Sequence, residues 1–210
     1  MGRAAGRADE GATFVLVGGV PGAGKSTALA WVSGLRPGVR VLDSEQARRG
    51  LRARVPRRVP YAVYRPVVHA WHVWGVVRTV LAGPSGWGSG GIGDGAGALV
   101  VHDPATSAAR RRWWAWLARR GGWRPVLVMV DVERAEALSG QVARGRVVRS
   151  KAFARHWGRW AAQRERLVSV AGGADGGWEQ VCVVERAGAA GAVLSVVDGR
   201  TLVGAGGRSG

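Results

Sequence analysis

The 210-residue sequence has no asparagine, one isoleucine, one cysteine and only two lysines. A single cysteine, Cys182, cannot form an internal disulfide, and its valine neighbours favour a position in a buried strand. No apolar run approaches the roughly 20 residues needed to cross a bilayer, and the first residues lack an apolar stretch long enough for a signal peptide. The sequence therefore predicts a soluble, cytoplasmic protein with no membrane partner.

The net charge of +17 comes from 31 basic residues, 29 of them arginine, against 14 acidic residues. A charge of this size favours a nucleic-acid partner. However, abundant Gly, Ala, Val, Arg and Trp, together with the lack of asparagine, is typical of a GC-rich genome. Part of the charge therefore reflects codon usage, and nucleic acid is a less favoured partner on composition alone.

Short apolar runs alternate with longer helical stretches, which is the pattern of βαβ units and a mostly parallel sheet. Five strands are predicted as continuous apolar runs, at 13–17, 39–43, 99–103, 126–131 and 180–184. Helices are predicted over 25–34, 44–53, 62–81, 106–120, 134–143 and 152–168. The length suits one domain over 12–200, between flexible ends at 1–11 and 201–210.

Directly after the first predicted strand, residues 19–27 read GVPGAGKST and match the phosphate-binding pattern G-x-x-x-x-G-K-[ST]. Glycines let backbone N–H groups point at phosphate oxygens, and the following helix adds the positive end of its dipole. We expect Lys25 to contact the β- and γ-phosphates of ATP and Ser26 to bind Mg²⁺. A compact ammonium fits this loop better than a guanidinium, which explains a lysine in an arginine-rich chain. The expected ATP-binding residues of the loop are Gly19, Gly22, Ala23, Gly24, Lys25, Ser26 and Thr27.

Other features argue against three classes of P-loop protein. Switch GTPases recognise guanine through an asparagine-lysine-x-aspartate motif, and this chain has no asparagine. AAA+ motors place Asp-Glu at the end of a strand, whereas neither Asp103 nor Asp131 is followed by glutamate. The run Leu138-Ser139-Gly140-Gln141 is only a shortened version of the transporter-ATPase signature. The small kinase type remains, in which positioning, Mg²⁺ and arginines catalyse phosphoryl transfer.

Four segments together, GGVPGAGKST, LDSEQARR, ALVVHDPAT and an arginine-rich stretch after the fourth strand, resemble the P-loop kinases related to polynucleotide kinase. Zeta toxins and chloramphenicol phosphotransferase belong to this group, as do proteins described only as AAA-family ATPases. The resemblance covers about residues 12–186. It implies a three-layer α/β P-loop NTPase sandwich, with a five-stranded sheet in the order 2-3-1-4-5 and helices on both faces. It also implies Mg²⁺-dependent transfer of the γ-phosphoryl group of ATP to the hydroxyl of an unidentified acceptor.

The same resemblance implies that Glu45 accepts the proton of the acceptor hydroxyl and that Arg48 holds the acceptor or its phosphate. Glutamate stands where aspartate is usual, so Asp43 is an alternative base. The dipole of a following helix would also stabilise an acid at this position without any catalytic role. Asp103, at the end of the third strand, is expected to hold a Mg²⁺-bound water opposite Ser26.

The arginine-rich stretch, at about 141–152, lies where these kinases carry a lid. The resemblance implies that Arg144 and Arg146 stabilise charge in the transition state, with Arg149 as a weaker candidate. Arg186, after the fifth strand, is expected to stack on adenine. In a chain so rich in arginine, each of these is also a candidate surface residue.

Three further features complete the predictions. Tyr61, Tyr64, Val68, Trp71 and Val76 fall at helical spacing, which favours packing in the core over lining an acceptor pocket. The glycine-rich segment 83–97 is predicted to be a connector rather than a ligand-covering loop. Basic clusters at 48–58 and 110–120 indicate an alternative function, an ATP-dependent nucleic-acid-binding or regulatory ATPase.

Overall fold

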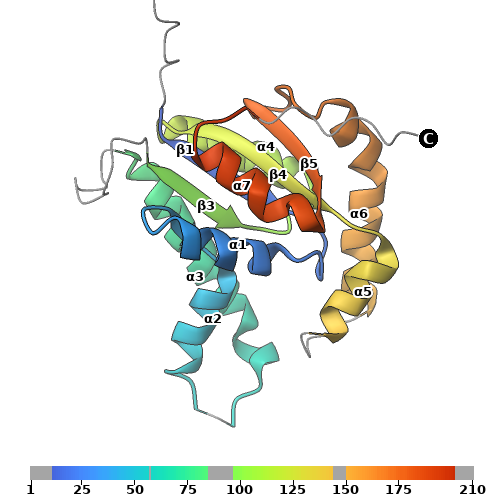
Figure 1. Ribbon diagram of the computed structural model, residues 1–210. Coiled ribbons are helices and arrows are strands. Elements are labelled where there is room, and N and C mark those ends of the chain that lie inside the picture. The colour runs from blue at the N-terminus through green and yellow to red at the C-terminus, as the bar shows by residue number, and fades with distance from the viewer. Residues whose placement is uncertain (1–10, 57, 85–96, 144–149, 202–210) are drawn as a thin grey trace, which may run out of the picture.

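A single parallel sheet organises the chain, whose computed structural model describes residues 11–56, 58–84, 97–143 and 150–201. The strand order is β2-β3-β1-β4-β5, and every neighbouring pair is parallel (Figure 1). The strands are β1 (Thr13–Gly18), β2 (Arg40–Leu42), β3 (Ala98–His102), β4 (Arg124–Asp131) and β5 (Gln180–Glu185). This architecture confirms the predicted α/β sandwich and its strand order.

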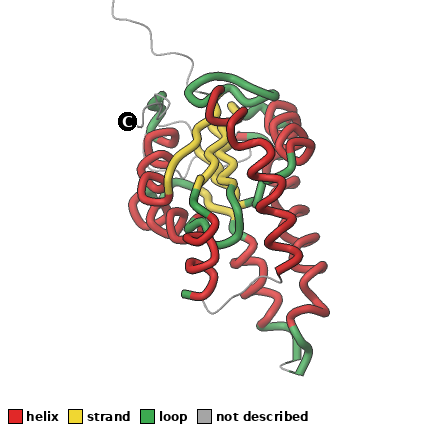
Figure 2. Tube along the Cα trace, turned by 90° about the vertical axis from the view of Figure 1, so that its right-hand side faces the viewer, coloured by secondary structure: helices red, strands yellow, loops and turns green. Residues whose placement is uncertain are grey.

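Helices cover both faces of the sheet (Figures 1 and 2). On one face α1 (Lys25–Leu35) packs against α7 (Ala189–Val197), and on the other α3 (Tyr61–Leu81) packs against α4 (Ala108–Arg120). A second set of helices joins these elements: α2 (Ser44–Arg52), α5 (Arg134–Val142), α6 (Ser150–Ser169) and the short 3-10 helix η2 (Arg186–Gly188). The pair formed by α2 and α3 extends away from the sheet at the bottom of Figure 1.

The centre of the sheet forms the core because its strands are apolar on both faces. Every residue of β1 is buried, and β4 is buried over six of its eight residues. The Phe14 ring lies 6.1 Å from the Trp114 ring of α4 and 6.4 Å from the Trp178 ring. At the sheet edge, β2 is three residues long and only partly buried, shorter than the predicted strand, because it has one neighbouring strand and less cover.

Two predictions about helices were incomplete or wrong. The sequence reasoning missed α7. Gly191 weakens the helix propensity of this segment, and burial of Val193 and Val196 stabilises the helix instead. Core packing is confirmed for Tyr64, Val68 and Val76 but wrong for Trp71, which is 58% exposed. The buried residues of α3 recur every four positions, so the buried stripe drifts around the helix and leaves Trp71 outside it.

Cys182 lies buried in β5, as its valine neighbours predicted, and burial raises the pKa of its thiol to about 11. Across the described ranges, no helix combines the length and the apolar character that a membrane span requires. The predicted flexible ends were 1–11 and 201–210, and all of their residues except 11 and 201 fall outside the described residues, as does most of the glycine-rich segment.

Two buried tryptophans differ in one hydrogen bond, which allows a stability test. The Nε1 donor of Trp160 bonds to the Asp131 carboxylate at 3.1 Å, whereas that of Trp114 has no partner among the described groups. We expect Trp160→Phe to lower the free energy of unfolding by about 1–2 kcal/mol more than Trp114→Phe, because only the former breaks a hydrogen bond, to the partly buried carboxylate of Asp131. Urea unfolding followed by circular dichroism measures the difference, and an equal or larger loss in Trp114→Phe would contradict it.

Candidate active site

The turn between β1 and α1 adopts a backbone conformation that depends on glycine. Gly19, Gly22 and Gly24 have φ values of +141°, +91° and +93°. A Cβ atom on Gly22 would lie 1.9 Å from the carbonyl oxygen of Ala137 in α5. Gly24 caps the N-terminus of α1, so the first N–H groups of that helix lie beside the loop. This arrangement of N–H groups and helix dipole suits a phosphate group.

Lys25 supplies positive charge at the centre of the loop. Its side chain is buried, and Nζ donates hydrogen bonds to the carbonyl oxygens of Gly19 at 2.7 Å and Val20 at 2.9 Å. Ala23 is fully buried, and Thr27 faces the neighbouring cavity. The loop therefore holds a charged ammonium within its own curve, where an anionic ligand would gain a charge-assisted hydrogen bond.

Because β1, β2 and β3 are parallel neighbours, their carboxyl ends lie together at the same end of the sheet. The N–H of Gly19 donates to the carbonyl of Pro104 at 2.9 Å, and the N–H of Asp103 donates to the carbonyl of Val17. These bonds join the start of the loop to the end of β3. Ligand sites of open α/β sheets lie at this edge.

Asp43 is the carboxylate that contacts the loop helix. It caps α2 by accepting the N–H of Glu45 at 3.0 Å, and it also accepts hydrogen bonds from the Ser26 hydroxyl and from Nδ1 of His102, at 2.7 Å. Burial alone would raise the pKa of Asp43, but these hydrogen bonds and the charge of His102 outweigh it and hold the pKa below its usual range. Asp43 is therefore an anion beside Ser26.

Glu45 and Arg48 form an ion pair one turn apart on α2. The Oε1 atom of Glu45 accepts from Nε of Arg48 at 2.9 Å and from its Nη2. The side chains are 26% and 31% exposed, so a ligand can reach both. The structure thus brings the two residues together next to Asp43, at the same sheet edge as the loop.

Asp103 has a different environment from the one the sequence predicted. It is buried, its Oδ1 accepts the N–H of Ala105 at 2.8 Å, and its Oδ2 accepts Nε of Arg110 at 2.7 Å. Ser26 is paired with Asp43 instead. The metal role of Asp103 stays a prediction, and the geometry favours Asp43 for it. Asp131, at the end of β4, is held by Trp160 and Arg164.

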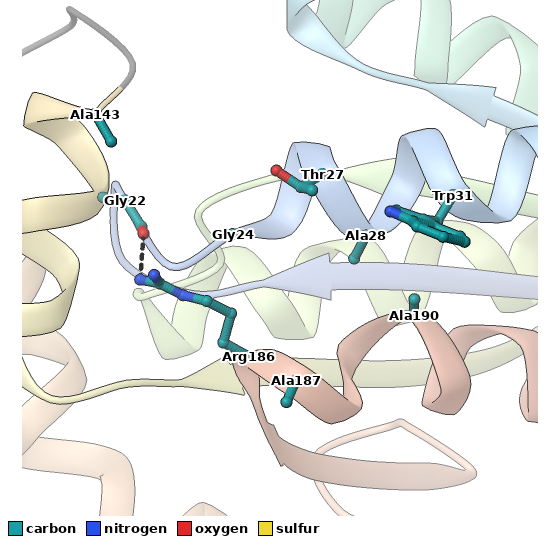
Figure 3. A pocket seen from close by; sticks show the side chains of 10 residues that line it. Gly22, Gly24, Thr27, Ala28, Trp31, Ala143, Arg186, Ala187 and Ala190 are labelled. Carbon is teal, nitrogen blue, oxygen red and sulfur yellow. Dashed lines mark hydrogen bonds between the residues drawn. The ribbon is translucent and has the colours of Figure 1, made fainter.

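A cavity of about 560 Å³ opens beside the loop, between α1, α5 and the start of α7 (Figure 3). Its volume lies within the range of small-molecule sites. Arg186 borders it, with Nη2 donating to the carbonyls of Gly22 at 2.8 Å and Glu136 at 3.1 Å. The guanidinium thus braces the loop against α5, while stacking of Arg186 on adenine stays a prediction.

Two residues of this region were missed by the sequence reasoning. Trp31 of α1 lines the cavity and is 64% exposed, a position that a helical wheel of α1 would have indicated because it lies off the buried face. His156 of α6 lies 3.0 Å from the Thr106 hydroxyl through its Nδ1. Burial lowers the pKa of His156, and the positive charge of nearby Lys25 lowers it further. No sequence pattern links His156 to the loop.

The lid arginines Arg144, Arg146 and Arg149 lie outside the described residues. Within the described ranges, no group of three or more His, Cys, Asp or Glu residues could hold a metal ion by itself. Any Mg²⁺ would therefore depend on few protein ligands together with phosphate oxygens, as is usual for this ion.

No protein-family model matches the sequence, and no curated protein matches it. Among solved structures, the chain is similar to one from the PezAT chromosomal toxin-antitoxin system of Streptococcus pneumoniae. The TM-score is 0.53 at 13% identity, over 86% of this chain and 70% of that one. It is also similar to the tunicamycin resistance protein of Deinococcus radiodurans, with a TM-score of 0.50 at 16% identity, over 91% of this chain and 98% of that one. The chain has a P-loop kinase-like fold.

Two glycines provide a matched test of the loop. Gly22→Ala places a methyl group against Ala137 at a positive φ, whereas a Cβ on Gly34 of α1 would meet nothing within 4 Å. We expect Gly22→Ala to abolish binding of a fluorescent ATP analogue and to lower the melting temperature. Gly34→Ala should keep the binding and gain about 0.5–1 kcal/mol of helix stability. Normal nucleotide affinity in Gly22→Ala would refute the assigned loop conformation.

The lowered pKa of Asp43 predicts a pH-dependent contribution to stability. Because the pKa is lower in the folded protein than in the unfolded chain, the contribution is complete above about pH 3.9 and is lost as the pH falls further. We expect Asp43→Asn to cost about 1–3 kcal/mol at neutral pH and progressively less below about pH 4.

The control for this test is Asp198→Asn, which removes an exposed ion pair with Arg36 and should cost less than about 1 kcal/mol. Urea unfolding between about pH 6 and pH 2 measures both variants. A cost of Asp43→Asn that stays constant down to the lowest pH would show that its carboxylate is not stabilised as an anion.

Proposed function

We propose that this chain is a kinase that transfers the γ-phosphoryl group of ATP, with Mg²⁺, to a hydroxyl of an acceptor molecule. The main observation behind the proposal is that three groups lie together at the carboxyl ends of the strands. These are the loop with the Lys25 ammonium, the hydrogen-bonded pair of Ser26 and Asp43, and the accessible pair of Glu45 and Arg48.

The residues at this edge fit a Mg²⁺ ion. The Ser26 hydroxyl and the Asp43 carboxylate are hard oxygen ligands, and Asp43 is held ionised. Asp103 is a less direct candidate, because Arg110 and Ala105 already engage both of its oxygens. Bound at this edge, Mg²⁺ would offset negative charge on the phosphates.

The loop, the cavity and Arg186 would orient the nucleotide. Loop N–H groups and Lys25 would bind the phosphates, and the base would enter the cavity lined by Trp31. An exposed indole offers a flat apolar surface for a base. Arg186, by holding Gly22 against α5, would keep the loop in its binding conformation.

In the transfer step, residues of α2 would act on the acceptor. The acceptor oxygen would form a bond to the γ-phosphorus while the bond from that phosphorus to the β-γ bridging oxygen breaks and ADP leaves. Glu45 would take the proton of the acceptor hydroxyl, and Arg48 would orient the Glu45 carboxylate and the acceptor. Lys25, with Arg144 and Arg146 from the arginine-rich stretch, would stabilise the charge on the transferred group.

Glu45 can be tested against an acid far from the site. With [γ-³²P]ATP and a panel of nucleosides, 5′-hydroxyl oligonucleotides, sugars and antibiotics, we expect the wild type to label one class of acceptor. Glu45→Gln should lower the transfer rate about 10²–10⁴-fold with little change in ATP affinity, because only the proton acceptor is lost. Glu165→Gln, an exposed acid of α6, should transfer at the wild-type rate.

A companion variant, Lys25→Ala, should lose ATP binding itself, measured by calorimetry with and without Mg²⁺. Unchanged ATP affinity in Lys25→Ala would reject the nucleotide site. Full transfer by Glu45→Gln would reject Glu45 as the base. ATP hydrolysis that needs no acceptor and does not depend on Glu45 would favour the regulatory ATPase instead.

A further inference from the structure

The positive charge of the chain is concentrated in one segment. Residues 46–130 contain 14 arginines and no lysine, but only two acids, Asp94 and Asp103. These 85 residues therefore carry +12 of the net charge of +17. A codon bias acts on the whole coding sequence, so it does not explain why acidic residues are missing here in particular. The segment contains residues 46–52 of α2, which leaves out Ser44 and Glu45 at its start, and all of α3 and α4.

Tryptophans lie exposed on two helices of the same segment. Trp71 and Trp74 of α3 are 58% and 55% exposed, and Trp116 of α4 is 58% exposed. The rings of Trp71 and Trp74 are 6.4 Å apart and tilted. Large apolar side chains that gather at the surface of a soluble fold mark interaction sites more often than isolated ones do.

The two helices lie side by side on one face of the sheet (Figure 1). At their C-terminal ends, the Trp123 indole after α4 donates to the carbonyl of Val80 in α3 at 2.9 Å. A Cβ atom on Gly121 would lie 2.1 Å from that same oxygen. Val76 and Val80 of α3 belong to the same core cluster as the buried side chains of α4, so in this part of the two helices the exposed side chains face outwards.

Arginines alternate with these tryptophans. The guanidinium of Arg78 lies over the Trp74 ring, 4.7 Å from its centroid, and Arg119 and Arg120 follow Trp116 by three and four residues on α4. Neither helix contains an acidic residue, and no ion pair within the described ranges involves these three arginines. We call this set the Trp–Arg surface; it consists of Trp71, Trp74, Arg78, Trp116, Arg119 and Arg120.

We propose that the Trp–Arg surface binds single-stranded nucleic acid. Exposed indole rings provide stacking platforms for unpaired bases, and interspersed guanidinium groups contact the phosphates between them. A second copy of the chain is disfavoured because identical faces would bring like charges together. An anionic membrane is disfavoured because Trp116 on α4 has Arg112, Arg119 and Arg120 within one turn, so no continuous apolar band spans both helices.

This surface is separate from the proposed nucleotide-binding cavity. The cavity beside the loop is lined by α1, α5 and the start of α7, whereas the Trp–Arg surface lies on α3 and α4, on the other face of the sheet from α1 and α7. Binding here therefore requires neither ATP nor phosphoryl transfer. The proposed binding of nucleic acid does not depend on which molecule accepts the phosphoryl group.

Fluorescence anisotropy of a labelled oligothymidylate of about 15 nucleotides, without ATP, tests the surface in the full chain. We expect wild-type binding to weaken with salt, with a log–log slope of about −0.7 for each phosphate contact. Trp71→Ala/Trp74→Ala should weaken binding about tenfold or more through lost stacking. Arg119→Glu/Arg120→Glu should weaken it and make the salt slope shallower.

Two controls match these changes elsewhere on the molecule. Leu35→Ala removes an exposed apolar side chain at the end of α1, and Arg200→Glu reverses an exposed charge after α7. Both should bind the oligonucleotide as the wild type does. Thermal unfolding should show all variants folded, because each substituted side chain is exposed.

Several results would overturn the proposal. The surface assignment fails if the variants of α3 and α4 bind as tightly as the wild type, or if the two controls lose as much affinity. Equal or tighter binding of a duplex of the same length would exclude stacking on unpaired bases. Binding to phosphatidylserine vesicles but not to the oligonucleotide would identify a membrane surface, and self-association that Trp71→Ala/Trp74→Ala abolishes would identify a second copy.

Discussion

The geometry of the candidate site depends on the close contact between the backbone at Gly22 and α5. There is no room for a side chain at Gly22, because Ala137 occupies that space. A Cβ atom on Gly140, one turn further along α5, would lie 2.4 Å from the carbonyl oxygen of Gly22. Arg186 bonds to the same carbonyl and to the carbonyl of Glu136 in α5. The loop is therefore held by two elements that come more than 100 residues later in the chain.

The carboxyl ends of the strands carry one positively charged and one negatively charged region. Lys25 makes the centre of the loop positive, whereas Arg186 beside it is paired with Glu136. The three hydrogen bonds to Asp43 maintain a negative charge next to Ser26. In the proposed kinase, the field between these opposite charges would favour a metal ion between the Asp43 carboxylate and phosphate oxygens. The folded chain thus orders the charges before any ligand arrives, so less reorganisation is needed on binding.

Sequence reasoning succeeded where one local signal is sufficient. Continuous valine and leucine runs predicted all five strands, and the glycine spacing with Lys25 predicted the loop. It was weaker where a contact joins distant residues. Asp43 and Asp103 both end a strand, and only the fold shows that one meets Ser26 and the other Arg110. Likewise Trp71 has core-like spacing, yet the drift of the buried stripe along α3 leaves it exposed.

The single buried thiol has a practical consequence for studying this protein. Cys182 is the only cysteine of the chain, it lies within β5, and at neutral pH its raised pKa leaves almost none of it as the reactive thiolate. A cysteine introduced at any exposed position would therefore react with maleimide or spin labels far faster than the native one. Distances between α2, α3 and the loop can be followed spectroscopically on the natural background, with β5 left intact.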